Sequence, residues 1–386
     1  MKFKKLGNTD LDVSLICLGT MTWGTQNSEK DAFEQMDYSI SEGVNFFDTA
    51  EIYSVPPTSE SYGKTEIMIG NWFEKRKNRE KIILASKVAG PGCSWIRGGG
   101  NNFDEKKIKE AIDGSLKRLK TDFIDVLWLH IWDYSTPYDE IVLSINDLIK
   151  EGKILYAGLS SVPAWQIARM NSYADHHGLH PFIALQNEWS LVERSHEPEY
   201  LPMCKELDLG ITCWSPLHGG LLSGKYTDGS VDQSVPNRML PHVTDPSQFW
   251  YEATQRNLAI LKDLQPIVDE VGEPWSAFAL RWLMQRNETV TIPIYSARTE
   301  AQSQESLRAT EFELSEDQMK RINEITAPAI SSPYPAFGPY PYTMLEYGSP
   351  ALPNFYSRAL LYGETESMIK NHRVSNPYTF YPSTDA

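Results

Sequence analysis

Four residues of the sequence have the types and the spacing for general acid chemistry. Asp48, Lys87 and His130 each end an apolar run (VNFFD, KIILASK and FIDVLWLH), and Tyr53 follows Asp48 by five residues. In a barrel of parallel strands, the carboxyl ends of the strands converge on one mouth, where catalytic groups lie. A lysine beside a tyrosine favours the phenolate and lowers the tyrosine pKa, and an aspartate keeps that lysine charged. The spacing therefore predicts a tyrosine that exchanges a proton near neutral pH.

The elements that must position these residues alternate between strand-like and helix-like segments. A hairpin is expected over the first fourteen residues, around the turn signal Asn8-Thr9-Asp10. Eight apolar runs, each followed by an amphipathic segment, then cover residues 14–19, 44–48, 81–87, 123–130, 154–160, 181–186, 211–216 and 289–294. This alternation predicts a parallel sheet with right-handed crossovers, and eight units fit an α/β fold of the (β/α)8 TIM-barrel type. An open, doubly wound sheet is the alternative, but no G-x-G-x-x-G motif follows the first strand.

The last sixty residues differ in composition from the rest of the chain. We expect one domain over residues 1–326 and, over 327–386, an extension without a core of its own. The extension is crowded with proline and tyrosine (SSPYPAFGPYPYTM, SNPYTFYPS) and is too aromatic for a typical disordered linker. Two interpretations stay open, because proline-tyrosine segments lie on surfaces and need partners. The extension is either an arm packed on the outside of the barrel, or a lid or dimer-exchanged arm that reaches the mouth of the barrel. A homo-oligomer is possible through such an arm.

Composition restricts the partners and the compartment. A hydrophobic content of 41% and a charged content of 23% are ordinary for a globular protein. The net charge of −15 argues against nucleic acid or an anionic membrane as a partner. No metal site is expected, because the four cysteines lack metal-ligand spacing and the adjacent histidines of ADHHGLH point apart on a helix. The N-terminus lacks the apolar core of a signal peptide and no apolar run reaches membrane-spanning length, which predicts a cytoplasmic protein.

The motifs FFDTAEIY, ILASK and LWLH, with the strand GKILYAGLS, resemble those of the aldo-keto reductase superfamily in order and spacing. The sequence most resembles the branch that holds aryl-alcohol dehydrogenase-like reductases and potassium channel β-subunits. The resemblance implies an NADPH-dependent oxidoreductase that reversibly reduces an aldehyde or ketone to the alcohol. It also implies that Tyr53 protonates the carbonyl oxygen, that Lys87 and Asp48 tune Tyr53, and that His130 orients the carbonyl.

The same resemblance assigns the cofactor contacts. Residues expected to bind NADP(H) are Gly19, Thr20, Ser160, Ser161, Gln186, Trp214, Ser215, Leu217, Gly219, Lys225, Arg238, Arg298, Gln302 and Glu305. Trp214 is expected to stack on the nicotinamide, and the glycines of SPLHGGLLSGKY to let backbone N–H groups approach the pyrophosphate. Arg298 is expected to hold the adenosine 2′-phosphate, which favours NADPH over NADH. Tyr295, Ser296 and Ser306 depart from the family signature, so the strength of this preference stays open.

Substrate recognition is expected from four tryptophans near strand ends, namely Trp23, Trp95, Trp132 and Trp189. Aromatic faces suit aryl aldehydes and also the apolar faces of sugars, so both substrate classes stay open. Two other functions are considered beside the reductase. One is a sugar-specific dehydrogenase or epimerising enzyme with retained NADP, and the other is a regulatory binding protein like the channel β-subunits. Nothing in residues 1–50 resembles an inactivation peptide, which disfavours the second.

Overall fold

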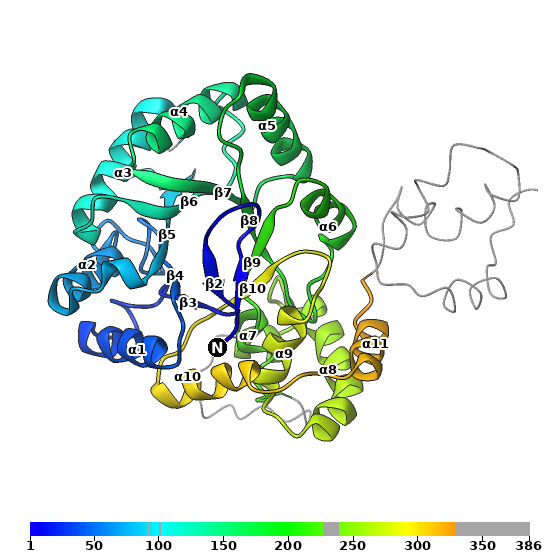
Figure 1. The fold of residues 1–386 in the computed structure, drawn as a ribbon. Coiled ribbons are helices and arrows are strands. Elements are labelled where there is room, and N and C mark those ends of the chain that lie inside the picture. Colours follow the sequence, from blue (N-terminus) through cyan, green and yellow to red (C-terminus); the bar gives the residue numbers. More distant parts are fainter. Residues whose placement is uncertain (91–92, 100–101, 227–238, 329–386) are drawn as a thin grey trace, which may run out of the picture. The chain divides into compact units, whose positions relative to one another are not determined.

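Eight parallel strands close into a barrel in the computed structural model, which describes residues 1–90, 93–99, 102–226 and 239–328 (Figure 1). The strand order is β10-β3-β4-β5-β6-β7-β8-β9. The barrel strands are β3 (Cys17–Gly19), β4 (Phe46–Asp48), β5 (Ile83–Ala89), β6 (Ile124–His130), β7 (Ile154–Ser160), β8 (Ala184–Glu188), β9 (Gly210–Trp214) and β10 (Thr291–Tyr295). An antiparallel hairpin of β1 (Phe3–Lys5) and β2 (Asp12–Ser14) precedes them. The predicted (β/α)8 barrel with an N-terminal hairpin is confirmed, and the doubly wound alternative is wrong.

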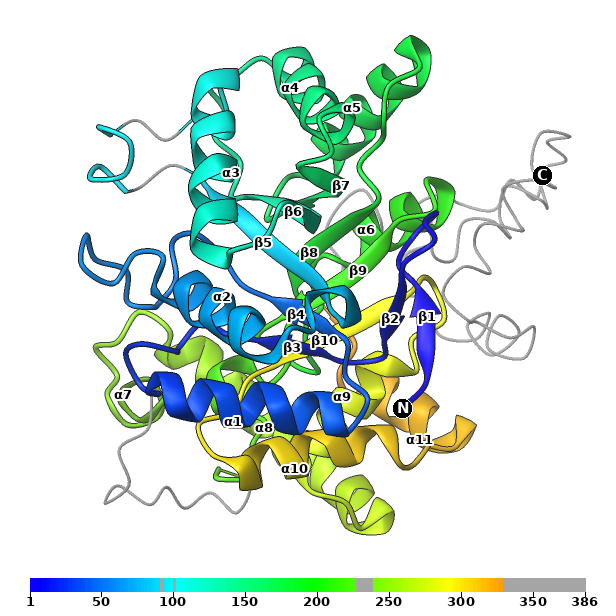
Figure 2. The same cartoon turned by 60° about the vertical axis from the view of Figure 1, so that its left-hand side comes forward.

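Helices follow the strands around the barrel, and α1, α2 and α3 lie side by side on one flank (Figure 2). The helices are α1 (Glu29–Ser41), α2 (Lys64–Arg76), α3 (Glu105–Leu119), α4 (Tyr138–Lys150), α5 (Ala164–His177), α6 (Glu197–Glu206), α7 (Leu240–Thr244), α8 (Tyr251–Val271), α9 (Trp275–Met284), α10 (Glu300–Leu307) and α11 (Glu316–Ile325). Short 3₁₀ turns are η1 (Arg79–Lys81), η2 (His218–Gly220) and η3 (Arg308–Thr310). Local sequence sets several of the helix starts. A capping box of Ser28 and Asp31 begins α1, and Thr299 caps α10.

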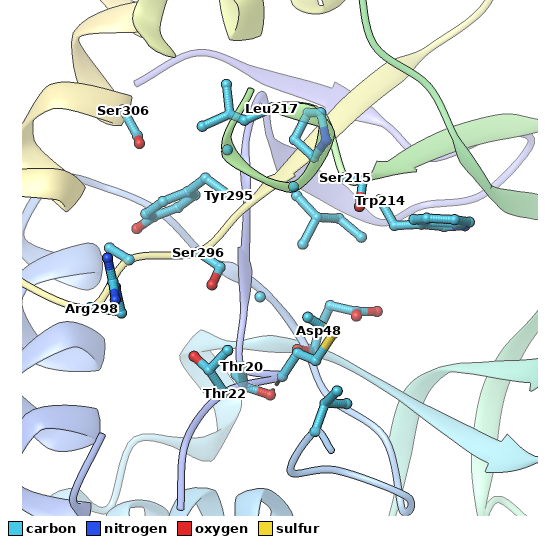
Figure 3. A pocket seen from close by; sticks show the side chains of 18 of the residues that line it. Thr20, Thr22, Asp48, Trp214, Ser215, Leu217, Tyr295, Ser296, Arg298 and Ser306 are labelled. Atoms are coloured by element: carbon cyan, nitrogen blue, oxygen red, sulfur yellow. Dashed lines mark hydrogen bonds between the residues drawn. The ribbon is translucent and has the colours of Figure 1, made fainter. Parts of the chain in front are cut away.

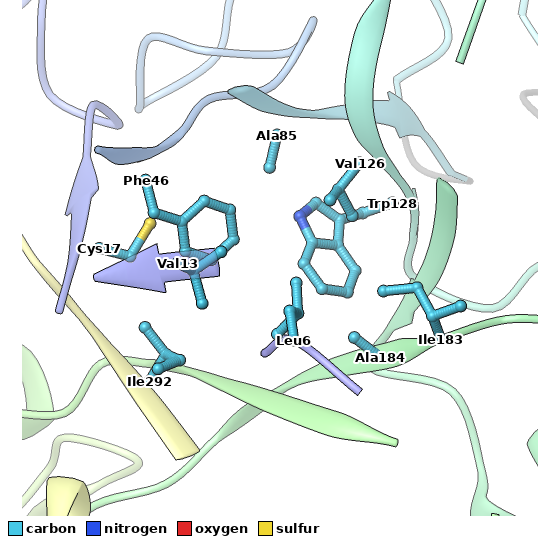
Figure 4. Packing of buried hydrophobic residues seen from close by; sticks show 10 residues of the cluster. All are labelled: Leu6, Val13, Cys17, Phe46, Ala85, Val126, Trp128, Ile183, Ala184 and Ile292. Carbon is cyan, nitrogen blue, oxygen red and sulfur yellow. The ribbon is translucent and has the colours of Figure 1, made fainter. Parts of the chain in front are cut away.

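The hairpin places apolar side chains inside the amino-terminal end of the barrel. Leu6 and Val13 are fully buried and pack with side chains from six barrel strands (Figure 4). The other buried members of this cluster are Cys17, Phe46, Ala85, Val126, Trp128, Ile183, Ala184 and Ile292. Because this end of the barrel is filled with apolar side chains, polar residues at the opposite strand ends are left to form a site.

Contacts divide the chain into two compact units. The main unit comprises Met1–Arg194 and Met203–Ala327, and it contains the whole barrel. The second comprises Ser195–Pro202 and Pro328–Ala386, and in its described part residues 197–202 are helical. Residues 329–386 lie outside the described residues. The boundary at residue 327, the arm or lid, and the homo-oligomer therefore stay predictions. In the described ranges, no helix is both long and apolar enough to cross a membrane.

Candidate active site

The four predicted catalytic residues lie together at the carboxyl ends of neighbouring strands. Asp48 ends β4, His130 ends β6, and Tyr53 follows β4 in a loop. Lys87 lies in β5 between them, two residues before that strand ends at Ala89, so the expectation that it ends its strand is wrong. The Lys87 Nζ donates a hydrogen bond to Asp48 Oδ2, and it lies 4.9 Å from the centroid of the Tyr53 ring. The Tyr53 and His130 rings meet edge to face, with centroids 6.1 Å apart. The sequence pattern thus brings these side chains into one cluster.

Lys87 and Asp48 form an ion pair that is almost completely buried. Their exposed fractions are 1% and 3%. Lys87 Nζ also donates to the Thr49 carbonyl at 2.8 Å, and Gln186 Nε2 donates to Asp48 Oδ1 at 2.9 Å. Burial alone would lower the pKa of Lys87, but Asp48 and Tyr53 outweigh it and raise that pKa above its ordinary value. The lysine therefore stays charged beside the tyrosine.

The protonation state of Tyr53 differs from the expectation. Burial raises the pKa of Tyr53 above its ordinary value, although Lys87 acts to lower it. The predicted effect of the lysine is present, but the desolvation of a phenolate at this site is larger. The expectation of a tyrosine that titrates near neutral pH is therefore wrong. At neutral pH Tyr53 is a protonated phenol, which is the state that a general acid needs.

His130 is held as a neutral imidazole by its surroundings. Burial, followed by the charge of Lys87, lowers the pKa of His130 to about 3. Its backbone passes very close to Gly90, the residue that follows β5, because a Cβ on Gly90 would lie 2.2 Å from the His130 carbonyl oxygen and 2.6 Å from that of Ile131. Ile131 has a φ of 70°, an unusual conformation for a β-branched residue. Only glycine at position 90 leaves room for this sharp turn at the end of β6.

A cavity of about 940 Å³ runs from these residues to the start of α10. Figure 3 shows Asp48 and Trp214 on one side of it and Arg298 and Ser306 on the other. Asp48, Tyr53 and His130 line the cavity. Of the predicted cofactor residues, those that line it are Gly19, Thr20, Ser161, Gln186, Trp214, Ser215, Leu217, Gly219, Lys225, Arg298, Gln302 and Glu305. Ser160 is buried and is the strand partner of His130, and Arg238 lies outside the described residues.

The middle of the cavity has the features of an anion site. Gly219 and Gly220 have φ values of 65° and 102°, and a Cβ on Gly220 would meet no atom within 4 Å, so the backbone there is open to the cavity. The Gly220 N–H donates to the Leu217 carbonyl at 2.9 Å, so the donor that this turn can offer to an anion is the Gly219 N–H. Lys225 and Arg298 are exposed, and within the part of the chain that the structure describes their side chains have neither hydrogen bond nor ion pair. Two exposed cations therefore border the same cavity.

Tyr295, one of the residues that depart from the family signature, makes contacts of its own at the end of the cavity near α10. Tyr295 is buried, and its hydroxyl hydrogen-bonds to Ser39 of α1 over 2.7 Å, which ties β10 to that helix. The backbone of Arg298 is fixed on both sides. Its N–H donates to Gln302 Oε1 at 2.8 Å, and its carbonyl accepts from Asn27 Nδ2 at 3.0 Å. The exposed guanidinium of Arg298 thus extends from a fixed point of the main chain.

The four predicted substrate tryptophans are not among the residues that line the cavity. Trp23, Trp132 and Trp189 are buried, and Trp23 donates a hydrogen bond to Gln35 at 3.0 Å. Trp95 is 38% exposed and packs edge to face on Tyr62, with centroids 5.8 Å apart. The assignment of these tryptophans to the substrate stays a prediction.

Sequence reasoning missed the apolar side chains that line the cavity beside Tyr53. These are Met21, Ile52, Val55 and Ile131. Two of them had a signal in the sequence, since Ile52 immediately precedes Tyr53 and Ile131 immediately follows His130. In this protein the residues next to Tyr53 and His130 line the cavity, whereas the four tryptophans are not among its lining residues.

Comparison with known proteins identifies the family of the chain. The profile of the aldo/keto reductase family matches residues 15–327. An uncharacterized oxidoreductase, YrpG, of Bacillus subtilis is 34% identical over 84% of this chain and 96% of its own length. The protein Tas of Escherichia coli is 33% identical over 84% and 97%, and an aryl-alcohol dehydrogenase [NADP(+)] of Phanerodontia chrysosporium is 29% identical over 85% and 86%. The chain belongs to the aldo/keto reductase family, whose oxidoreductases use nicotinamide cofactors.

Proposed function

We propose that this protein reduces an aldehyde or ketone to the alcohol with NADPH, reversibly, and that Tyr53 is the general acid. The observation that carries the proposal is a protonated phenol held between a charged lysine and a neutral histidine at the wall of a large cavity. A carbonyl oxygen in front of Tyr53 would gain its proton as negative charge develops on it.

The residues around the cavity fit a nicotinamide dinucleotide. Trp214 offers a flat face at the cavity wall, and Arg298 offers a guanidinium for a 2′-phosphate. Lys225 and the Gly219 N–H offer a positive charge and a hydrogen-bond donor for the pyrophosphate. When bound, the reduced nicotinamide would supply a hydride to the carbonyl carbon.

The protein's own part in the reaction is proton transfer and orientation. Tyr53 donates its hydroxyl proton to the carbonyl oxygen, and the Lys87 ammonium stabilises the phenolate that remains. Asp48 keeps Lys87 charged through the buried ion pair. His130, neutral at physiological pH, can donate a hydrogen bond to the same oxygen without competing for the proton. In the reverse direction the phenolate accepts the proton of the alcohol.

The apolar wall beside Tyr53 supports an apolar carbonyl substrate, such as an aryl aldehyde, over a sugar. Met21, Ile52, Val55 and Ile131 offer no side-chain hydrogen bonds, and buried sugar hydroxyls without partners would each be costly. A relative named for aryl-alcohol oxidation with NADP(+) agrees with this choice. No observation of the structure favours the sugar-specific or the channel-regulatory alternative.

The first test is turnover with a substrate panel. Purified protein is mixed with NADPH and with aryl aldehydes, alkyl aldehydes or keto-sugars, while the absorbance of NADPH is followed and the alcohol is identified by mass spectrometry. We expect one alcohol formed per NADPH consumed, with aryl and alkyl carbonyls preferred. Turnover limited to keto-sugars would contradict the substrate class, and cofactor binding without any turnover would contradict the proposed activity.

Replacing Arg298 by Met should weaken NADPH binding about 10- to 100-fold and leave NADH binding unchanged. A hydrogen bond to a charged group contributes roughly 1.5–3 kcal/mol, which corresponds to that range. The dissociation constants of both cofactors are measured by fluorescence titration. Arg308→Met is the matched control, because Arg308 is an exposed arginine in the same region that pairs with Glu273 instead of lining the cavity. Equal weakening of both cofactors in Arg298→Met would argue against a role at the 2′-phosphate.

The pH dependence of reduction follows from the protonation states. Because burial raises the pKa of Tyr53 above the ordinary value of 10.0, the acid form persists throughout neutral and mildly alkaline pH. His130, with a pKa of about 3, does not titrate in that range. We therefore expect kcat/KM for reduction to stay level from pH 7 to about pH 9 and to fall only at higher pH. A fall centred near neutral pH would mean that another group controls the proton transfer.

A further inference from the structure

Glu51 is a fully buried carboxylate, two residues before Tyr53, that the proposed reaction does not use. Its carboxylate accepts four hydrogen bonds. Three of them come from residues outside the 49–63 loop, to which Glu51 belongs. Arg97 Nη1 and Nη2 donate at 2.7 and 2.9 Å, the Ala89 N–H at 2.6 Å and the Tyr62 hydroxyl at 3.0 Å. Its side chain lies behind the cavity wall instead of lining it. A buried charge with this many partners fixes the position of each of them.

The backbone around Glu51 connects the strands that carry the catalytic residues. The Glu51 N–H donates to the Lys87 carbonyl at 3.2 Å. Ala89, whose N–H the Glu51 carboxylate accepts, is the strand partner of His130. Glu51 thus holds the loop of Tyr53 against the end of β5, between the lysine and the histidine.

Arg97 connects the same carboxylate to a loop at the mouth of the barrel. Its side chain is only 9% exposed, although it belongs to the loop segment 93–99. In that segment Cys93 and Ile96 are buried against Ala89, and Ile52 packs on the same cluster. Ile52 also lines the cavity beside Tyr53. A displacement of the 93–99 segment would therefore change the wall that faces the substrate.

We propose that Glu51 is a positioning residue, and that its ion pair with Arg97 holds the 93–99 segment against Ile52 and so sets the shape of the substrate wall. The consequence for substrate affinity rests on the proposed function. The structural part of the proposal, that the ion pair holds the 93–99 segment against Ile52, does not rest on the proposed function. Loss of Arg97 leaves Glu51 with Tyr62 and Ala89, and with Arg118 Nη2 at 3.9 Å, so the barrel itself keeps a charge partner for the carboxylate.

Alkylation of Cys93 tests the structural part without any need for activity. All four cysteines of the chain are buried, and Cys93 is the one in this segment. Folded wild-type protein, Arg97→Met and Arg97→Lys are treated with iodoacetamide, and labelling of the Cys93 peptide is followed by mass spectrometry. We expect Arg97→Met to label at least about tenfold faster, and Arg97→Lys to be intermediate because one ammonium cannot replace a bidentate guanidinium.

Arg79→Met is the matched control for this experiment. Arg79 also forms a buried ion pair, with Asp125 at 2.6 Å, but neither residue lines the cavity. Loss of the Arg79–Asp125 ion pair should lower the free energy of unfolding. Cys93 should stay as protected from alkylation as in the wild type. Unchanged protection of Cys93 in Arg97→Met, or equal exposure in Arg79→Met, would overturn the proposal.

Kinetics test the effect on the substrate. In Arg97→Met we expect KM for the carbonyl to rise about tenfold, kcat to fall much less, and the dissociation constant of NADPH to stay unchanged. Glu51→Gln should lower kcat as well, by about 10- to 100-fold, because small displacements of a catalytic group have effects of this size. If Arg79→Met lowered kcat as much as Glu51→Gln does, lost stability would explain the effects of both Arg97→Met and Glu51→Gln. The positioning role would then be overturned.

The outcomes separate this proposal from the proposed function. If the wild type turns over no carbonyl, the proposed activity fails while the Cys93 labelling still decides whether the pair holds the segment. If Glu51→Gln does not fold, the two Arg97 variants decide both parts, because they leave the buried carboxylate in place.

Discussion

Replacing Tyr53 by Phe is expected to lower kcat for carbonyl reduction by about 10²- to 10⁴-fold and to leave NADPH binding intact. The range is the usual contribution of a general acid. The variant removes one hydroxyl oxygen and keeps the ring, so the edge-to-face contact with His130 and the position of the ring 4.9 Å from the Lys87 Nζ are retained. Initial rates of NADPH oxidation give kcat, and quenching of tryptophan fluorescence gives the NADPH dissociation constant.

Tyr156→Phe is the control for this prediction. Tyr156 is a half-buried tyrosine of β7 whose hydroxyl donates to Asp10 at 2.6 Å, and it does not line the cavity. The same chemical change there should leave kcat within twofold of the wild type. If Tyr53→Phe retained full activity, the proton would have to come from another group, and the proposed mechanism would be refuted.

The barrel and the cluster of Asp48, Tyr53, Lys87 and His130 are predictable from the sequence because both depend on local patterns. A parallel strand that is buried on both faces has a sequence that is an apolar run. The last residue of such a strand lies at the carboxyl end of the barrel, so a polar residue at that position indicates the mouth of the barrel. The runs that end in Asp48 and His130 illustrate this relation, whereas Lys87 lies two residues before the end of β5. The order of the three residues along the chain is also their order around the barrel. Spacing along the chain therefore determines which side chains meet.

The properties that were not predictable depend on packing between distant segments. The pKa of Tyr53 is decided by how much protein surrounds the ring, which the neighbouring residue types do not reveal. A tryptophan near a strand end can face the cavity or pack beneath a loop. Trp189 packs edge to face on Trp282 of α9, and no local sequence pattern predicts this contact. In the same way Arg97 meets Glu51 only because the chain returns to the barrel mouth.

Replacing Lys87 by Met is expected to lower the free energy of unfolding by about 3–5 kcal/mol, which is typical when one member of a buried ion pair is removed. The two side chains have similar length, so the loss comes from the charge that remains. The Asp48 carboxylate would keep the hydrogen bond from Gln186 at 2.9 Å but would have no cation beside it. Chemical denaturation monitored by circular dichroism measures the loss. The variant should also lose most of its activity, since Tyr53 would have no ammonium to stabilise its phenolate.

The double variant Lys87→Met, Asp48→Asn separates the two consequences of that change. Asparagine keeps an oxygen that can accept the Gln186 hydrogen bond, and it removes the unpaired charge, so much of the lost stability should return. Activity should not return with it, because the ammonium beside Tyr53 is still absent.

A double variant as unstable as Lys87→Met would show that the cost lies in packing instead of charge. A double variant that regained activity would show that the lysine acts only to neutralise Asp48. The expected result, restored stability without restored turnover, would assign the buried pair to the chemistry of Tyr53 and not to the stability of the barrel.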